Sequence, residues 1–231
     1  MNHHIGIAAV SPTGAALFYQ ALSRHAAEMP QRHDELRFSV HNEPLAQYLD
    51  AINRDDWMKV GVLLRRSAEL AARCGAKFCV TPDAAVQQAI QFASEGSPIP
   101  WLTMTDLVAD AVAADKHKMV GIIGTDLVMN SSTFQIPLGV RGIQMIAPEE
   151  ADRIEIDKII YGELIKGHIT TKSQAFATQV IAKLKYESKC GAVILASSET
   201  PLLVKPDNSA LPLYDASEIL AVAALKYAYT N

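Results

Sequence analysis

FCVTPDAA at residues 78–85 and VILASSET at residues 193–200 are short apolar runs that each stop abruptly at small polar residues. This pattern is typical of a buried parallel strand that carries a side chain to the edge of a sheet. Asp83 and Ser197 stand at the two strand ends, so they are the first candidates for a functional role.

Apolar runs of strand length alternate with helical patterns along the whole chain. Strands are expected at 5–10, 36–41, 78–81, 101–103, 119–123, 143–146, 192–195 and 211–214. Helices are expected at 15–28, 57–74, 84–92, 105–114, 151–166, 173–190 and 216–229. Alternation of this kind predicts parallel βαβ units, and therefore an α/β fold with doubly wound sheets.

A faint internal repeat divides the expected fold into two lobes. Ser11 and Asp83 are 72 residues apart, and Thr125 and Ser197 are also 72 residues apart. Ligands of open α/β sheets bind outside the carboxyl ends of the strands. We therefore expect two pseudo-symmetric lobes with the ligand in a cleft between them. The expected lobes comprise residues 1–98 with 207–231 and residues 99–206.

Composition excludes several classes of function. The 231 residues are 49% hydrophobic and 20% charged, with a net charge of -4, as in an ordinary globular protein. The sequence has no basic stripe with interleaved aromatic residues, which argues against a nucleic-acid partner. It has no apolar stretch near the roughly 18 residues that span a bilayer. We expect neither nucleic acid nor membrane as a partner.

The cysteines indicate a reducing compartment. Cys74, Cys79 and Cys190 are odd in number and lack the spacing of a disulfide framework. The N-terminus also lacks the pattern of a secretory signal, so we expect a cytoplasmic protein. No cluster of His, Cys, Asp or Glu has metal-ligand spacing, and no phosphate-binding or dinucleotide motif is present. The sequence therefore predicts no metal site.

Five segments in order along the chain resemble the aspartate/glutamate racemase family. They are SPTGAALFY (11–19), GAKFCVTP (75–82), IIYGELIKG (159–167), SETPLL (198–203) and YDA (214–216). The resemblance implies two pseudo-symmetric α/β lobes, no cofactor, an amino-acid or other small carboxylate ligand and a homodimer.

The sequence departs from that family where its chemistry is carried out. Racemases of the family use two thiols that face each other across the α-carbon of the substrate. The first of these cysteines corresponds to Asp83 and the second to Ser197. The resemblance therefore implies catalytic positions at Asp83 and Ser197, refilled with a carboxylate and a hydroxyl group.

The resemblance also implies the substrate-binding positions. The family's C-N-T triplet corresponds to Asp83, Ala84 and Ala85, which lack the amide and hydroxyl groups that hold a carboxylate. The family's G-C-T triplet keeps a hydroxyl group at Ser198. Thr125 is retained at the turn that would hold a carboxylate.

Ser11 and Glu199 complete the candidate set. Ser11 lies at a strand end before a helix, where backbone N–H groups can bind an anion. Glu199 follows the second catalytic position and is either a minor catalytic candidate or a surface or capping carboxylate. The basic residues that bind a distal carboxylate in some members are replaced by Gln47-Tyr48, with Arg54 or Lys172 as substitutes.

The acidity of the carboxyl and hydroxyl groups that stand in place of the two thiols decides what chemistry is feasible. A serine hydroxyl is far less acidic than a thiol, so Ser197 would need its own general base. A carboxyl group in an apolar pocket has a raised pKa, which would suit Asp83 to act as a single base or a general acid. The structural alternatives are a helix N-cap for Asp83 and a strand-end turn residue for Ser197.

Three functions are consistent with these residues. The first is an isomerase of the racemase type that acts on a small carboxylate or amino acid without thiol chemistry. The second is a non-catalytic protein that binds a small carboxylate. The third is a lyase or hydrolase that uses Asp83 and Ser197. The resemblance favours the first, whereas the replaced cysteines favour the other two.

Overall fold

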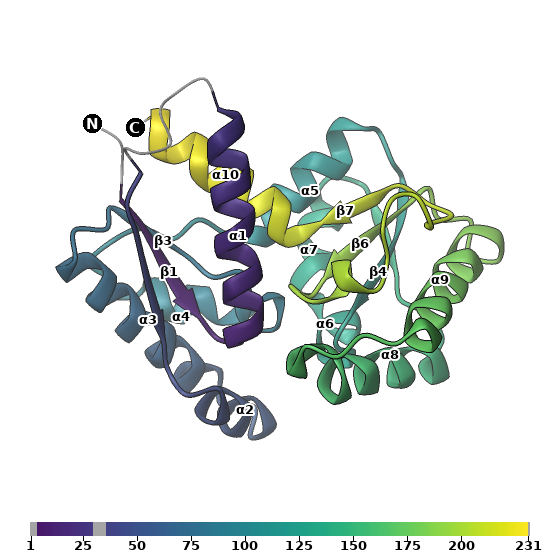
Figure 1. Cartoon of the computed structure of the whole chain (residues 1–231), viewed down its shortest axis with the longest axis horizontal. Coiled ribbons are helices and arrows are strands. Elements are labelled where there is room, and N and C mark those ends of the chain that lie inside the picture. Colours follow the sequence, from purple (N-terminus) through teal and green to yellow (C-terminus); the bar gives the residue numbers. More distant parts are fainter. Residues whose placement is uncertain (1–3, 30–35, 231) are drawn as a thin grey trace. The chain divides into compact units, whose positions relative to one another are not determined.

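The computed structural model describes residues 4–29 and 36–230, which form two compact units (Figure 1). The first unit comprises Met1–Met104 with Leu220–Asn231, and the second comprises Thr105–Ile219. Each unit contains a sheet of parallel strands that alternate with helices along the chain. The predicted α/β fold with two parallel-sheet lobes is confirmed.

The sheet of the first unit has the order β2-β1-β3, with β1 (Ile5–Ala9) in the centre. β2 (Phe38–Asn42) and β3 (Phe78–Val80) pair with β1 in parallel. The strand expected at 101–103 is reduced to a single bridge between Cys79 and Trp101. Proline at 98 and 100 restricts pairing there, because proline has no N–H to donate.

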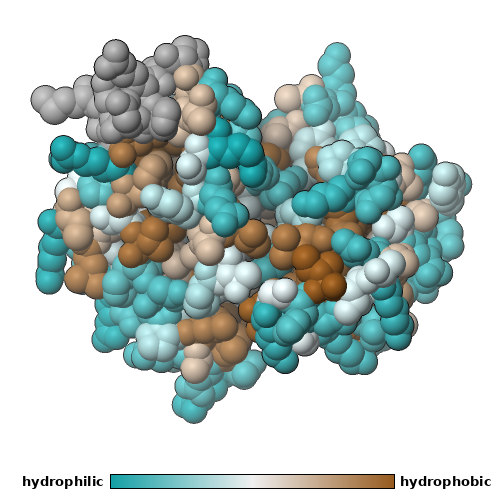
Figure 2. Space-filling model, viewed as in Figure 1, coloured by the Kyte–Doolittle hydropathy of each residue, from teal (hydrophilic) through white to brown (hydrophobic). Residues whose placement is uncertain are grey.

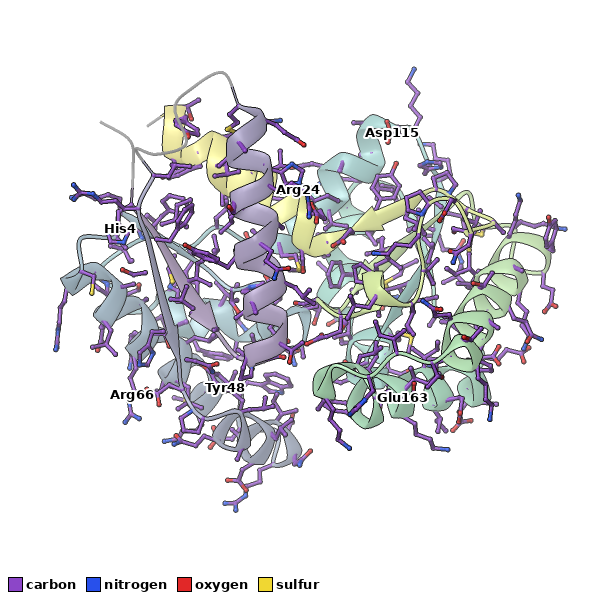
Figure 3. The ribbon with its side chains drawn as sticks, viewed as in Figure 1. His4, Arg24, Tyr48, Arg66, Asp115 and Glu163 are labelled. Carbon is purple, nitrogen blue, oxygen red and sulfur yellow. The ribbon has the colours of Figure 1, made fainter. Side chains whose placement is uncertain are left out.

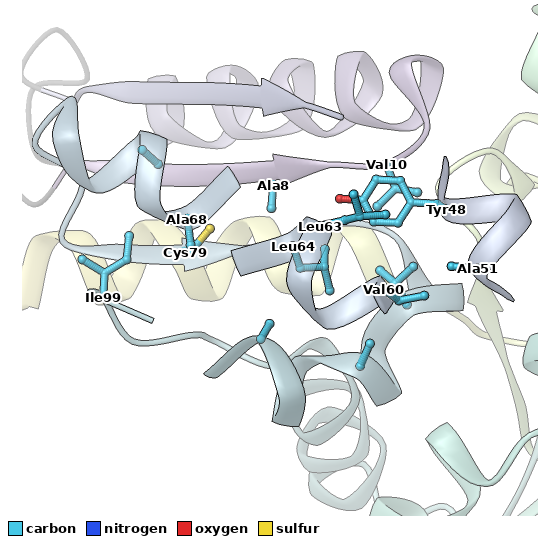
Figure 4. Close-up of a cluster of buried hydrophobic side chains, with 14 of the residues drawn as sticks. Ala8, Val10, Tyr48, Ala51, Val60, Leu63, Leu64, Ala68, Cys79 and Ile99 are labelled. Atoms are coloured by element: carbon cyan, nitrogen blue, oxygen red, sulfur yellow. The ribbon is translucent and has the colours of Figure 1, made fainter. Parts of the chain in front are cut away.

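Helix α3 (Trp57–Arg73) is a long amphipathic helix of the first unit. Four of its inward residues, Val60, Leu63, Leu64 and Ala68, are fully buried in a cluster that also contains Ala8 (Figure 4). The helices are α1 (Pro12–Glu28), α2 (Leu45–Asn53), α3 (Trp57–Arg73), η2 (Ala84–Ala89), α4 (Ile90–Ser94) and most of α10 (Ala216–Thr230). Helix α3 begins after Asp56, whose side chain caps it.

The sheet of the second unit has the order β5-β4-β6-β7. Its strands are β4 (Met119–Gly124), β5 (Gln144–Ile146), β6 (Ala192–Ala196) and β7 (Leu213–Asp215). Its helices are α5 (Met104–Ala114), α6 (Asp126–Asn130), α7 (Ser132–Val140), α8 (Glu150–Gly162), η3 (Leu164–Lys166), α9 (Thr171–Tyr186) and η4 (Thr200–Leu202). The order β5-β4-β6 matches β2-β1-β3 of the first unit, as an internal repeat predicts.

The C-terminal strand differs from our expectation. We assigned residues 211–214 to the first lobe, but β7 pairs in parallel with β6, with Asp215 opposite Leu195. The apolar run alone cannot reveal which sheet it joins, because pairing is decided by contacts distant in sequence. The other expected lobe boundaries and the cleft between the lobes stay predictions.

Helix α5 follows the strands of the first sheet but belongs mainly to the second unit, and α10 follows the strands of the second sheet but belongs mainly to the first unit. From Leu220 onward α10 is part of the first unit, where the Tyr227 ring lies 4.7 Å from that of Phe78 on β3. From Thr105 onward α5 is part of the second unit, where Asp110 accepts a hydrogen bond from Arg141 Nε at 2.7 Å. The two units therefore repeat the same chain order as well as the same sheet order.

The visible face of the molecule is mainly polar (Figure 2). Figure 2 shows hydrophilic side chains over most of the visible face, with hydrophobic residues in smaller groups. Isolated exposed apolar residues are normal for a globular protein. Within residues 4–29 and 36–230, none of the helices combines the length and apolar character needed to cross a membrane.

Candidate functional site

Ser11 lies where the chain leaves β1 and enters α1. Its Oγ accepts a hydrogen bond from the N–H of Gly14 at 3.1 Å, and its carbonyl accepts one from Ala15. The Ser11 side chain is buried and caps the helix. Ser11 therefore has a structural role as the cap of α1, and a ligand role stays a prediction.

Asp83 lies two residues beyond Thr81, at the carboxyl end of β3. Its Oδ1 accepts a hydrogen bond from the N–H of Ala85 at 3.3 Å, so Asp83 caps η2. The side chain is half-buried, whereas the methyl group of Ala84 is buried. A half-buried carboxylate at a strand end can take part in proton transfer while it also caps a helix.

Two side-chain amides that sequence reasoning missed hold these strand ends in place. Gln87 donates through Nε2 to the carbonyl of Thr81 at 2.9 Å and accepts from the N–H of Met104 at 3.1 Å. Asn42 donates to the carbonyls of Ala9 and Val10, each at 3.2 Å. Gln87 lies four residues after Asp83 and is buried, and its burial is a property of the fold that the sequence pattern did not indicate.

Tyr48 occupies the region where a basic residue for a distal carboxylate was sought. Its side chain is 0% exposed and packs in the hydrophobic cluster of the first unit (Figures 3 and 4). Burial raises the pKa of its hydroxyl group, which makes no hydrogen bond of ordinary geometry among the described residues, although Ser67 lies near enough to lower that pKa. Arg54 is exposed and pairs with Asp50 at 2.9 Å. Tyr48 therefore fills the core and does not replace the basic group.

Thr125 caps the short helix α6 in the second unit. Its Oγ1 accepts from the N–H of Val128 at 3.4 Å. The next N–H, that of Asp126, donates to Oδ1 of Asp157 at 2.8 Å. Burial raises the pKa of Asp157, and Arg153 Nε binds the Asp126 carboxylate at 3.0 Å. The Asp157 carboxylate therefore already accepts a hydrogen bond from one N–H group of the turn at which a ligand carboxylate was expected.

Ser197 and Glu199 form a buried hydrogen-bonded pair just beyond β6. Ser197 Oγ donates to Oε2 of Glu199 at 2.8 Å, and the N–H of Glu199 donates back to Ser197 Oγ at 3.3 Å. The two residues are 9% and 4% exposed. The carbonyl of Ser197 accepts from Oγ1 of Thr200 at 2.7 Å, which fixes the turn. Glu199 is therefore neither a surface carboxylate nor a side-chain helix cap.

Asp215 is a second acidic group at this edge of the sheet that sequence reasoning did not select. Its Oδ1 accepts from the N–H groups of Ser217 and Glu218 at 2.9 and 3.1 Å. Burial raises its pKa to about 6. Ser217 Oγ also donates to Ser198 Oγ at 3.4 Å, which connects this helix start to the turn after β6. The YDA segment gave a signal for Asp215, but only as part of a resemblance.

The cysteines do not supply the missing thiols. Cys79 is buried within β3, and burial raises its pKa to about 12. Burial also raises the pKa of Cys190, and Cys74 lies exposed at the end of α3. Within the described ranges, no three His, Cys, Asp or Glu side chains gather as metal ligands do. The polar side chains just beyond the strand ends, at Ser11, Asp83, Thr125 and Ser197, are a carboxylate and hydroxyl groups.

Solved structures share this fold over nearly their whole length. A candidate Asp/Glu racemase from Yersinia pestis is 23% identical, with 99% of this chain and 100% of that chain covered and a TM-score of 0.87. An aspartate racemase homologue from Pyrococcus horikoshii is 19% identical, with 98% and 99% covered and a TM-score of 0.86.

Glutamate racemase from Francisella tularensis, whose crystal structure is a complex with D-glutamate, is more distant. It is 15% identical, with 99% of this chain and 80% of that chain covered and a TM-score of 0.68. The family model for Asp/Glu/hydantoin racemases matches residues 7–224. Because that match spans nearly all of the sequence, this chain belongs to the Asp/Glu/hydantoin racemase family.

Proposed function

We propose that this protein binds a small carboxylate or amino acid at the carboxyl ends of its parallel strands and exchanges the α-proton without a thiol. The observation that carries the proposal is the shared strand order of the two sheets, with a polar side chain just beyond β1 and β3 of the first and just beyond β4 and β6 of the second. These side chains are Ser11, Asp83, Thr125 and Ser197. Membership of the family and the D-glutamate complex of a distant relative support the ligand class.

Asp83 is the proposed base. Its carboxylate is half-buried at a strand end, and one oxygen is held by the N–H of Ala85. Gln87 fixes the backbone on which Asp83 is carried, through its bonds to the carbonyls of Thr81 and Asp83. A positioned carboxylate contributes about 10²–10⁴-fold to a proton transfer. Asp83 would remove the α-proton of the ligand, exchange it with solvent and return a solvent proton to the same face, so this exchange requires no thiol.

The second unit would contribute hydroxyl groups for ligand binding. Thr125 and Ser198 are both buried at strand ends, and Ser198 is connected to the start of α10 through Ser217. The Asp126 N–H is already bonded to Asp157, so the ligand is proposed to be held here through hydroxyl groups and not through that amide. Ala84 and Ala85 would contribute only backbone groups.

Deuterium exchange at the α-carbon tests the proposal. The protein is incubated in D₂O with D- and L-aspartate and glutamate, with no added cofactor, and loss of the α-proton signal is followed by NMR. We expect exchange by the wild type and a loss of about 100-fold or more in Asp83→Asn. Asp56→Asn is the matched control, because Asp56 also caps a helix through its carboxylate.

The outcomes separate the two main candidates. Exchange that survives in Asp83→Asn would contradict the role of Asp83. Ligand-induced thermal stabilisation without any exchange would overturn the proposed α-proton exchange and favour a non-catalytic binding protein. The homodimer implied by the resemblance stays a prediction, and light scattering on the purified protein measures it.

A further inference from the structure

The Ser197 hydroxyl group has the geometry of an activated nucleophile. Its Oγ donates to the buried carboxylate of Glu199 at 2.8 Å, within the 2.6–3.2 Å that joins a nucleophile to its general base. The N–H of Glu199 donates to the same Oγ, which fixes the hydroxyl orientation. A serine needs such a base because its hydroxyl group is too weakly acidic to react alone.

The position of the pair in the fold is the second part of the argument. Ser197 follows β6, the strand between β4 and β7, at the carboxyl edge where ligands of parallel sheets bind. The chain then turns into η4 at Thr200–Leu202. A serine between a parallel strand and a helical turn is also how other folds present a nucleophile at the edge of a sheet.

A second serine–glutamate bond in the same unit shows that the contact alone is insufficient. Ser173 Oγ donates to Oε2 of Glu163 at 2.7 Å. Ser173 also bonds to Thr170, which caps α9, so this pair joins the end of α8 to the start of α9 (Figure 3 labels Glu163). That pair has a structural role between two helices, whereas Ser197 and Glu199 lie at the edge of the sheet.

We propose that Ser197 and Glu199 form a nucleophile–base pair for acyl transfer from esters or amides of small carboxylic acids. Glu199 takes the hydroxyl proton as Ser197 Oγ bonds to the acyl carbon. The bond from that carbon to the leaving oxygen or nitrogen breaks, and the leaving group receives the proton from Glu199. Water, with Glu199 as base, then cleaves the ester, which releases the acid and restores Ser197.

This activity goes beyond α-proton exchange and does not depend on it. The proposed exchange uses Asp83 on the first unit, whereas acyl transfer uses a pair that lies wholly within the second unit. The acid that acyl transfer releases belongs to the same class of small carboxylate that the protein is proposed to bind.

A fluorophosphonate probe tests the pair directly, because it reacts with activated serine hydroxyl groups. The full chain is treated with the probe, and labelling is followed by intact mass and located by peptide mapping. We expect one label per chain at Ser197, none in Ser197→Ala, and labelling about 100-fold slower in Glu199→Gln. Ser173→Ala and Glu163→Gln are matched controls that should label at the wild-type rate.

Each outcome bears on the pair. An unlabelled wild type, when a known serine hydrolase reacts fully beside it, would overturn the proposal, as would a label at another residue. Wild-type labelling in Glu199→Gln would remove Glu199 as the base. Circular dichroism and thermal unfolding confirm that each variant is folded. Labelling reports on Ser197 and Glu199, whereas α-proton exchange reports on Asp83, so failure of one proposal is distinguished from failure of the other.

Discussion

Asp157 accepts a hydrogen bond from the backbone N–H of Asp126, with 2.8 Å between the nitrogen and Oδ1. The bond joins α8 to the turn after β4, where Thr125 was expected to help hold a ligand carboxylate. A ligand anion at this turn would meet an N–H that is already used and a carboxylate of like charge. Asp157 therefore limits which ligand groups the turn can accept.

Replacing Asp157 by Asn should strengthen the binding of small carboxylates. The substitution keeps an oxygen acceptor for the Asp126 N–H but removes the negative charge. Removing repulsion on the order of 1 kcal/mol should lower the dissociation constant about fivefold. Isothermal titration with aspartate and glutamate measures the change.

Glu155→Gln is the control for this prediction. Glu155 lies on the same helix and pairs with Lys158, with 3.6 Å between the charged groups, but it is not bonded to the turn. The control removes the same net charge, so it should leave the dissociation constant nearly unchanged. Equal effects of the two variants, or weaker binding in Asp157→Asn, would contradict a local role for Asp157.

Asp215 should make the stability of the protein depend on pH between about 4 and 6. Its pKa is raised from 3.8 to about 6 in the folded state, so the folded protein binds the proton more tightly than the unfolded chain does. This stabilisation is complete below pH 4, and it is lost as the pH rises to 6. The loss is on the order of 2 kcal/mol.

Asp215→Asn should remove that part of the pH dependence. Asparagine keeps the cap of α10 but cannot ionise, so the variant should gain stability relative to the wild type as the pH rises from 4 to 6. Urea unfolding at several pH values measures the difference between the two proteins. Asp56→Asn, at another helix cap, should not remove the slope. A constant difference across this pH range would show that Asp215 does not titrate there.

The local pattern of the chain was sufficient to predict most elements. Amphipathic spacing and a terminal glycine placed α3 at nearly its true bounds, and the apolar runs at 78 and 192 placed β3 and β6. α2 was missed because its N-cap is Pro44, which makes no side-chain cap. Sequence periodicity shows which face of an element is buried, and capping residues mark where the element ends. Elements that carry both signals are therefore predicted well.

The candidate site was predictable only in part, because its side-chain contacts depend on how the chain folds. Sequence placed Ser197 and Glu199 two residues apart, but their hydrogen bond depends on the turn geometry after β6. The contact between Asp157 and Asp126 joins residues 31 apart on different elements. Long-range side-chain contacts of this kind arise from packing, and local periodicity carries no record of them.

Tyr48→Phe should leave stability unchanged or raise it by about 1 kcal/mol. The Tyr48 hydroxyl group is buried and makes no hydrogen bond of ordinary geometry among the described residues, and such a group carries an unrecovered desolvation cost. Removing it keeps the ring in the hydrophobic cluster. The free energy of unfolding from urea denaturation measures the effect.

Tyr214→Phe is the matched comparison. The Tyr214 hydroxyl group donates a short hydrogen bond to the Asp115 carboxylate, so its removal should destabilise the protein by about 1–3 kcal/mol. The two variants lose the same atom from a buried tyrosine, and only the hydrogen bond differs. A loss of more than 1 kcal/mol in Tyr48→Phe would mean that its hydroxyl group has a partner, such as an ordered water.

Gly61→Ala should destabilise the first unit although it introduces a better helix former. Gly61 lies within α3, and an added Cβ would be 2.5 Å from Cβ of Phe92 and 3.0 Å from its backbone carbon. The close packing of α3 against α4 therefore requires glycine at this position. Forcing the two helices apart should cost about 1–3 kcal/mol, more than the roughly 1 kcal/mol that alanine gains in helix propensity.

Gly139→Ala separates helix propensity from packing. Gly139 lies in α7, and an added Cβ there would have no atom within 4 Å, so this variant should be stabilised by about 0.5–1 kcal/mol. Urea unfolding of the two variants and the wild type measures the expected loss of stability in Gly61→Ala and the expected gain in Gly139→Ala. Stabilisation of both would show that Phe92 can move aside at little cost, and that the approach of α3 to α4 does not depend on the missing side chain.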